Sequence, residues 1–170
     1  MIKHPTKKIW SRAKPFTLCC SNEELMELDD GLGLTPRKVE YLKFIFEKGG
    51  RVKTSEIACR FVVDPSTITK TIADLSSEGL IRHVPYRGVS LTPAGRRYAG
   101  FLVKRHRILS LALTQYGISG EQACREVARF ESFVSKDTVD TMCRTMGHPS
   151  LGICGEITHD SGCRGDKSGI

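Results

Sequence analysis

The stretch SEIACRFVVDPSTITKTIADLSSEGLI, residues 55–81, contains two short apolar patterns with helical spacing, separated by Asp64 and Pro65. Thr54 or Ser55 can cap a first helix. Asp64 can cap a second helix that has Pro65 in its first turn, where the missing N–H costs nothing. The apolar positions are Ile57, Ala58, Phe61 and Val62 in the first helix and Ile68, Ile72 and Leu75 in the second. Two short helices joined by a tight turn predict a helix-turn-helix.

The second predicted helix keeps polar side chains on or near the face opposite its apolar positions. These side chains are Ser66, Thr67, Thr69 and Lys70. In a helix-turn-helix the second helix enters the major groove of double-stranded DNA, so we expect these residues to contact DNA there. The alternative is a pair of ordinary core helices in which Ser and Thr serve only as helix caps.

The segment GLIRHVPYRGVSLTPAG, residues 79–95, follows directly and predicts a strand, a turn, a second strand and a new helix starting at Thr92 and Pro93. A helix-turn-helix followed by a basic hairpin is a winged helix. In that arrangement the wing side chains reach phosphates or the minor groove and position the protein without specifying sequence. The predicted wing contacts are Arg82, Tyr86 and Arg87.

The positive charge of the chain is concentrated around this predicted winged helix. The 170 residues carry a formal net charge of +7, and residues 35–107 hold 15 Lys and Arg against 6 Asp and Glu. A polyanion such as DNA or RNA is therefore the first partner to consider, although a solvated basic surface would have the same composition. No apolar run is long enough to span a membrane, and the N-terminus lacks the apolar stretch of a signal peptide, which predicts a cytoplasmic protein without a membrane partner.

Further helical patterns predict the rest of the architecture. One helix begins at Pro36 and ends at Gly49–Gly50, and a long helix of about six turns begins at Pro93. Two more helices can be capped by Ser119 and Ser135. The expected fold class is mainly α with a small β-hairpin wing. Because three short helices bury little apolar surface alone, a homodimer is also expected.

The chain has seven cysteines, an odd number without an export signal, which favours metal, cluster or redox chemistry over a disulfide framework. Five Cys and His residues lie close together near the C-terminus: Cys143, His148, Cys154, His159 and Cys163. They could bind zinc. A four-cysteine set could instead hold an iron–sulfur cluster, and its members are Cys124, Cys143, Cys154 and Cys163. The alternative is an unstructured tail with scattered thiols, because the segment has no C-x2-C pair.

The chain resembles the diphtheria toxin repressor family over about residues 34–157. Four stretches carry the resemblance: RVKTSEIACRFVVDPSTITKTIADLSSEGLIRHVPYRGVSLTPAGRRYA, VKRHRILSLAL, ACREVARFESFVS and MGHPSLGIC. That family includes iron-dependent repressors and manganese transport regulators. The motifs PYRGVSLTPAGRR and KRHR fall in its order and spacing. The resemblance implies a homodimeric transcription regulator, activated by a divalent metal such as iron or manganese, that binds palindromic operators of metal-uptake genes.

The patterns above and the resemblance to the short, two-domain form of the family together divide the chain into four segments. Residues 1–34 are an extension of unknown role, and residues 35–98 form the winged helix-turn-helix. Residues 99–147 form a helical metal-sensing and dimerisation domain, and residues 148–170 form a tail rich in Cys, His and Gly.

The resemblance also implies a metal site, which matches the family only in part. His106 stands at the position of the family's His in the linking helix, and Glu131 at that of a carboxylate ligand in the next helix. Cys124 is a soft substitute for a second His, and Glu40 takes the place of a ligand from the first helix. The departures are Lys43, Ser110, Ala128 and Ser132, which replace ligands of the family. A thiolate ligand in place of an oxygen ligand would shift the metal preference of the site from manganese toward iron, zinc or cobalt. The alternative is that the site has decayed and no longer binds metal.

No nucleophile–base pair, phosphate loop or acid pair stands out, so an enzyme is not expected. The leading hypothesis is a metal-responsive DNA-binding regulator. A second hypothesis keeps DNA binding but makes the cysteines a sensor of redox state or the ligands of an iron–sulfur cluster. A third makes the winged helix a protein-interaction module and the tail a structural zinc site.

Overall fold

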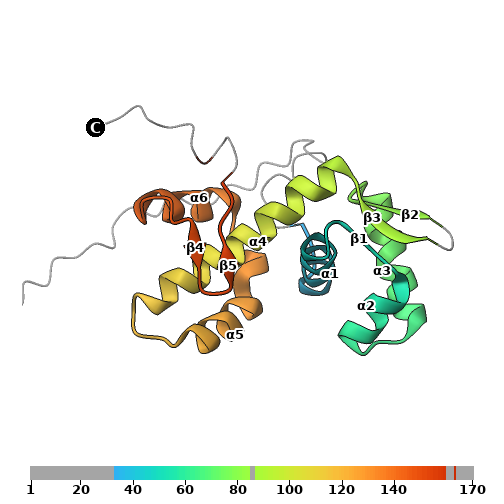
Figure 1. Ribbon diagram of the computed structural model, residues 1–170, viewed down its shortest axis with the longest axis horizontal. Helices are drawn as coiled ribbons and strands as arrows, with labels where there is room; N and C mark the ends of the chain where they lie inside the picture. The colour runs from blue at the N-terminus through green and yellow to red at the C-terminus, as the bar shows by residue number, and fades with distance from the viewer. Residues whose placement is uncertain (1–32, 85–86, 160–162, 164–170) are drawn as a thin grey trace, which may run out of the picture.

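The computed structural model describes residues 33–84, 87–159 and 163 (Figure 1). Tyr86 and all but the last two residues of the predicted extension 1–34 lie outside this part of the chain. The helices are α1 (Pro36–Glu47), α2 (Thr54–Phe61), α3 (Pro65–Ser77), α4 (Pro93–Thr114), α5 (Gly120–Phe130), the short 3-10 helix η1 (Glu131–Phe133) and α6 (Lys136–Thr145). The strands are β1 (Arg51–Val52), β2 (Ile81–Val84), β3 (Gly88–Leu91), β4 (Leu151–Gly152) and β5 (Gly155–Glu156).

The N-terminal part is a winged helix, which confirms the prediction (Figure 1). Three helices, α1 to α3, accompany an antiparallel sheet with the strand order β1-β3-β2. In the wing, Ile81 pairs with Leu91 and Val84 pairs with Gly88. Strand β1 is not among the predicted elements, because it has only two residues and therefore no readable alternation of apolar and polar positions.

The core of the helix-turn-helix follows the predicted periodicity except at Val62, which lies beyond the end of α2 and is 90% exposed. Ile57 of α2 and both Ile68 and Leu75 of α3 are fully buried, as are Leu42 and Ile45 of α1. Because apolar residues recur every three or four positions, each helix turns one face toward the shared core. The polar positions of α3 are left on the surface.

The start of α2 differs from the prediction by one residue. Lys53, and neither Thr54 nor Ser55, is the N-cap. The backbone N–H of Lys53 donates to Oε1 of Glu56 at 3.1 Å. Thr54 is therefore already inside the helix, and the carboxylate of Glu56, at the third helical position, caps the N–H of Lys53.

The long helix α4 connects the two parts of the molecule (Figure 1). As predicted, Thr92 caps it, since its Oγ1 accepts the N–H of Gly95 at 3.0 Å, and Pro93 is its first residue. A glycine is needed at position 95 because a Cβ there would lie 1.8 Å from the carbonyl oxygen of Leu80. The helix has 22 residues and contacts α1, α5 and α6. Neither α4 nor another described helix is long and apolar enough to cross a membrane.

The C-terminal part is helical and ends in a hairpin. Ser119 and Ser135 cap α5 and α6, as predicted, and accept the N–H groups of Gln122 and Thr138, both at 3.4 Å. After α6 the chain forms the antiparallel pair β4 and β5, which is not among the predicted elements. This hairpin lies against α4 (Figure 1).

A buried ion network joins α4 to α6. Lys104 and Asp140 are only 2% and 4% exposed, and their Nζ and Oδ1 atoms are 2.6 Å apart. Lys136 Nζ lies 2.5 Å from the second oxygen of Asp140. Burial alone would raise the pKa of Asp140, but the two lysine hydrogen bonds outweigh it and leave the pKa below its ordinary value.

Candidate metal centres and nucleic-acid interface

The four polar residues predicted to contact DNA on α3 form one exposed face. Ser66, Thr67, Thr69 and Lys70 are exposed, whereas Ile68 between them is fully buried. Hydroxyls can donate to or accept from base edges, and an ammonium can donate to phosphates. The exposed face of α3 therefore has the chemistry of a recognition helix.

The predicted wing contacts lie on the β2–β3 hairpin that follows α3. Arg82 and Arg87 are exposed, and Tyr86 lies outside the described residues. Gly88 has a φ of 87°, and a Cβ there would lie 2.2 Å from the carbonyl oxygen of Val52. The base of the wing is thus pressed against the chain at β1, while its arginines face solvent.

The buried carboxylate of Glu131 is engaged on both sides by protein groups. Its Oε1 accepts a hydrogen bond from Nζ of Lys43 at 2.7 Å, and its Oε2 lies 2.8 Å from Nδ1 of His106. Burial alone would raise the pKa of Glu131, but the hydrogen bond with His106 and the charge of Lys43 outweigh it and lower the pKa. Lys43 therefore supplies positive charge where a cation would approach Oε1.

Glu40, which the resemblance implied as a ligand, does not join this group. Its carboxylate pairs with Arg37 at 3.3 Å, and the Glu40 side chain is 47% exposed. Lys43, three residues further along α1, contacts Glu131 instead. Ser110 is fully buried, and its Oγ has no hydrogen-bond partner among the residues that the structure describes.

His106, Cys124 and Cys154 come together beside Glu131. One possible ligand atom from each of the three lies within 4.8 Å of the other two. Because Nδ1 of His106 contacts Glu131, Nε2 is the nitrogen that can bind a metal ion, and such carboxylate–histidine pairs orient ligands in metal sites. Desolvation and the neighbouring Cys124 thiol raise the pKa of Cys154, while Arg107 opposes the rise. One imidazole and two thiols suit iron(II), zinc or cobalt.

The β4–β5 hairpin brings Cys154 into this group. Cys154 lies in the two-residue turn between the strands. The neighbouring Ile153 packs on Gly120 at the start of α5, where a Cβ would lie 2.7 Å from Cγ2 of Ile153. Arg107 of α4 donates to the backbone carbonyl of Glu156. These contacts with α4 and α5 fix the turn that carries the thiol.

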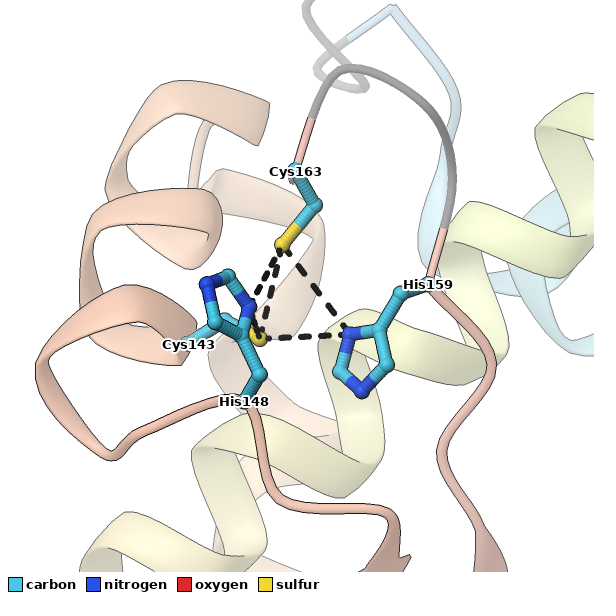
Figure 2. Close-up of side chains that lie close together, drawn as sticks. All are labelled: Cys143, His148, His159 and Cys163. Carbon is cyan, nitrogen blue, oxygen red and sulfur yellow. Dashed lines mark hydrogen bonds between the residues drawn. The ribbon is translucent and has the colours of Figure 1, made fainter. Parts of the chain in front are cut away.

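A second group of Cys and His side chains lies at the end of α6 (Figure 2). It contains Cys143, His148, His159 and Cys163, and one ligand atom of each lies within 4.8 Å of the others. The two sulfur atoms are 3.5 Å apart, which is too far for a disulfide bond. Burial and the neighbouring Cys163 thiol raise the pKa of Cys143 to about 12. Two thiols and two imidazoles are a common donor set for structural zinc.

The two groups divide the predicted ligands differently from the sequence analysis. Four members of the predicted tail set gather at α6, and the fifth, Cys154, joins His106 and Cys124. The four cysteines considered for an iron–sulfur cluster are therefore separated into two pairs. Within the described ranges, each group has the dimensions of a site for a single ion.

Family models match both parts of the chain. Residues 33–89 match the N-terminal DNA binding domain of the iron dependent repressors. Residues 92–157 match the metal binding and dimerisation domain of the same family. These two matches cover the winged helix and the lobe that contains the His106 group.

Curated relatives agree with the family models. The HTH-type transcriptional regulator MntR of Geobacillus kaustophilus is 34% identical over 109 residues, which cover 62% of this chain and 77% of that protein. The transcriptional regulator MntR of Salmonella typhimurium is 34% identical over 102 residues, which cover 60% of this chain and 65% of that protein.

Solved structures show the same fold. A hypothetical protein from Sulfolobus solfataricus has a TM-score of 0.63 at 28% identity, covering 74% of this chain and 100% of that one. A manganese-dependent transcriptional repressor in complex with manganese has a TM-score of 0.59 at 28% identity, covering 73% of this chain and 63% of that one.

The predicted resemblance is confirmed, and the family consists of transcriptional repressors and not of enzymes. The chain belongs to the iron-dependent repressor, or diphtheria toxin repressor, family of metal-responsive, dimeric DNA-binding transcription regulators.

Proposed function

We propose that this chain represses metal-homeostasis genes and that a metal ion bound by His106, Cys124 and Cys154 controls its binding to DNA. The observation that carries the proposal is the grouping of these three side chains next to Glu131. All three belong to the segment that matches the family's metal-binding and dimerisation domain.

Each residue of the proposed sensing site has a distinct role. Cys124 and Cys154 supply thiolates, and His106 supplies Nε2. Glu131 orients the His106 ring through Nδ1, and it is a positioning residue because Lys43 and His106 engage both of its oxygens. Glu40 has no part in this site, since it pairs with Arg37.

The donor set favours a thiophilic metal. The solved repressor with a TM-score of 0.59 contains manganese, an ion that prefers carboxylate and other oxygen ligands. In this chain two thiols and an imidazole form the group, and Lys43 takes one oxygen of the nearby carboxylate. We therefore expect iron(II), zinc or cobalt(II) to activate the protein at lower concentration than manganese(II).

DNA binding is assigned to the exposed face of α3 and to the wing. The proposed contacts are Ser66, Thr67, Thr69, Lys70, Arg82, Tyr86 and Arg87. A homodimer presents two α3 helices, so the operator would be a palindrome with half-sites spaced roughly 34–36 Å apart or a multiple of this distance. A regulator that acts on DNA in this way works in the cytoplasm.

The test selects operator fragments from genomic DNA with reduced protein and iron(II), and then measures affinity for one fragment with and without each metal. We expect a thiophilic metal to increase wild-type affinity at least about tenfold, within the usual range of coupling between two sites. Cys124→Ser and Cys154→Ser should lose this increase while keeping their metal-free affinity. Cys59→Ser is the matched control, because Cys59 is exposed and belongs to neither Cys/His group.

The control also defines the result that refutes the proposal. If Cys124→Ser and Cys154→Ser respond to iron(II) and zinc as Cys59→Ser does, the sensing site is not the His106 group. If manganese(II) activates at a lower concentration than iron(II), zinc and cobalt(II), the proposed choice of donors is wrong even if the location is right.

A further inference from the structure

A second metal site lies at the end of α6, apart from the proposed sensing site. We propose that Cys143, His148, His159 and Cys163 bind one thiophilic divalent ion, zinc before others, and that this ion fastens the C-terminal segment to α6. The inference goes beyond the proposed function, because it holds whether or not the His106 group senses metal.

The distances within the group match a tetrahedral site (Figure 2). With Zn–S bonds of about 2.3 Å and Zn–N bonds of about 2.0 Å, tetrahedral ligands are separated by about 3.8 Å for two sulfurs and about 3.5 Å for sulfur and nitrogen. The two sulfurs are 3.5 Å apart, and the sulfur–nitrogen distances are 3.5, 3.5, 3.6 and 4.0 Å. The four atoms are thus spaced as the ligands of one ion.

The end of α6 builds the first pair of ligands. The N–H of His148 donates to the carbonyl of Cys143, and the N–H of Gly147 donates to the carbonyl of Arg144, both at 2.9 Å. This pair of bonds is the Schellman motif, and Gly147 has the positive φ of 74° that the motif needs. The helix terminus itself therefore fixes His148 relative to Cys143.

His148 has a left-handed backbone conformation, which is uncommon among residues other than glycine. Its φ is 55°, and among the described residues only Val62 is another non-glycine with a positive φ. Such conformations persist where surrounding contacts require them, and they are frequent at functional sites. Here the left-handed backbone accompanies an imidazole whose Nδ1 lies 3.6 and 3.5 Å from the sulfurs of Cys143 and Cys163 (Figure 2).

The tautomer of His159 is set by a backbone carbonyl. Its Nε2 lies 3.2 Å from the carbonyl oxygen of Pro149. Because a carbonyl only accepts hydrogen bonds, Nε2 carries a proton, and in the neutral ring Nδ1 is then the nitrogen with the lone pair that can bind a metal ion. That Nδ1 lies 3.5 Å from the sulfur of Cys143 and 4.0 Å from that of Cys163. Such an outer hydrogen bond is what orients histidine ligands in metal sites.

Burial and charge also fit a bound divalent ion. Cys143 and Cys163 are 0% and 1% exposed. Two thiolates neutralise the charge of one divalent ion, so the two buried sulfurs can hold the ion without a net charge. Both sulfurs also belong to the hydrophobic core, but imidazole nitrogens lie within 4.8 Å of them, and of the four residues only His148 is exposed.

The site closes a loop around the hairpin that carries Cys154. His148 precedes β4, and His159 follows β5, so the ion would hold the chain on both sides of the hairpin. The segment would then be fastened at α6 and would deliver Cys154 to His106 and Cys124. This last step rests on the proposed function, whereas the binding of metal at α6 does not.

The test uses full-length Cys154→Ser protein, which lacks one ligand of the proposed sensing site, in reduced, metal-free form and titrated with cobalt(II). We expect one equivalent of cobalt(II) to bind with thiolate-to-cobalt charge-transfer absorption and tetrahedral d–d bands. Adding Cys163→Ser should weaken cobalt(II) binding at least about tenfold and reduce the charge-transfer band. Adding His159→Gln should weaken binding while keeping both thiolates, and adding Cys59→Ser should change neither property.

The inference is overturned if Cys154→Ser protein shows no thiolate–cobalt absorption, or if Cys163→Ser leaves that absorption unchanged. Circular dichroism checks that the variants fold, and His159→Gln separates the loss of a ligand from unfolding because both thiols remain. An intact cobalt spectrum in Cys154→Ser, together with a wild-type response of DNA binding to metal in the same variant, supports the α6 site and refutes the proposed sensing site.

Discussion

Nζ of Lys43 and Oε1 of Glu131 lie 2.7 Å apart, although the two residues are 88 positions apart in the sequence. Their side chains are 17% and 4% exposed. The ammonium of Lys43 therefore occupies the position beside the buried carboxylate of Glu131 where a divalent ion could otherwise bind. His106 takes the other side at 2.8 Å. This arrangement leaves thiols, and not carboxylates, as the open donors of the neighbouring group.

Replacing Lys43 tests whether its ammonium stands where a metal ion could bind Glu131. In metal-free protein, Lys43→Met should lower the free energy of unfolding by about 2 kcal/mol, less than for a fully buried pair because His106 still contacts Glu131. The change also frees Oε1 of Glu131 for a cation. Manganese(II) should then raise the melting temperature of Lys43→Met more than that of the wild type, as measured by thermal unfolding with and without the ion.

Lys38→Met is the matched control for this prediction. Lys38 also lies on α1 with a side chain 17% exposed, and it pairs with Glu78 at 2.6 Å. Its replacement should destabilise the protein without any added effect of manganese(II). An equal response to manganese(II) in Lys38→Met and Lys43→Met would contradict the role of Lys43.

The basic side chains of α3 and the wing should contribute to DNA affinity through phosphates. We expect Lys70→Ala and Arg87→Ala to weaken binding to all sequences alike and each to reduce the slope of log affinity against log salt by about one. Fluorescence anisotropy at several salt concentrations measures both effects. Arg125→Ala removes an exposed charge from α5 and should leave the slope unchanged. If the slopes of all three variants equal that of the wild type, the assigned DNA surface is wrong.

Local signals in the sequence were sufficient to predict most of the fold. Apolar residues at helical spacing, with Thr92, Ser119 and Ser135 as caps, predicted helices that the structure contains. Each of these signals depends on residues only a few positions apart. The start of α2 differs from the prediction because its N-cap is Lys53, whose side chain is not a typical cap, and Glu56 accepts the N–H of Lys53.

The grouping of the ligands could not be predicted in the same way, because it depends on contacts between distant segments. Cys154 was assigned to a tail set, since only the packing of the β4–β5 hairpin on α4 brings it to His106. Glycines on both sides of the turn were the one local signal for that hairpin. The ion pair of Lys43 and Glu131 likewise requires α1 to pack near η1, which no short motif encodes.

The turn of the helix-turn-helix should be open to stabilisation. Val62 has φ 49° and ψ 52° and is 90% exposed, so a β-branched side chain occupies the left-handed region without burying surface. Val62→Asn should raise the free energy of unfolding by about 1 kcal/mol, because asparagine adopts this conformation more readily. Val63→Asn, at a position that packs against the core, should instead destabilise. Urea unfolding measures the unfolding free energy of both variants. A loss of stability in Val62→Asn would show that the backbone of Val62 is not strained.

The buried network at Asp140 predicts a dependence of stability on pH. Lys104 and Lys136 hold the pKa of Asp140 below its ordinary value despite burial. The stabilisation is therefore complete above the unfolded-state pKa of about 3.9 and is lost as the pH falls through the lower folded-state pKa. Asp140→Asn should cost about 3 kcal/mol at neutral pH, because the buried Lys104 then faces a neutral partner.

In acid, the loss of unfolding free energy in Asp140→Asn relative to the wild type should be smaller than at neutral pH. This pH dependence would identify the ionised carboxylate of Asp140 as the cause of the loss. Urea unfolding of metal-free protein from about pH 6 to about pH 3 measures the difference in unfolding free energy between the wild type and Asp140→Asn. We expect this difference to stay constant down to about pH 4 and to decrease below it. Asp137→Asn changes an exposed carboxylate of the same helix and should give a small gap throughout. A gap for Asp140→Asn that stays constant to pH 3 would mean that the variant loses packing, and not an ion pair, between α4 and α6.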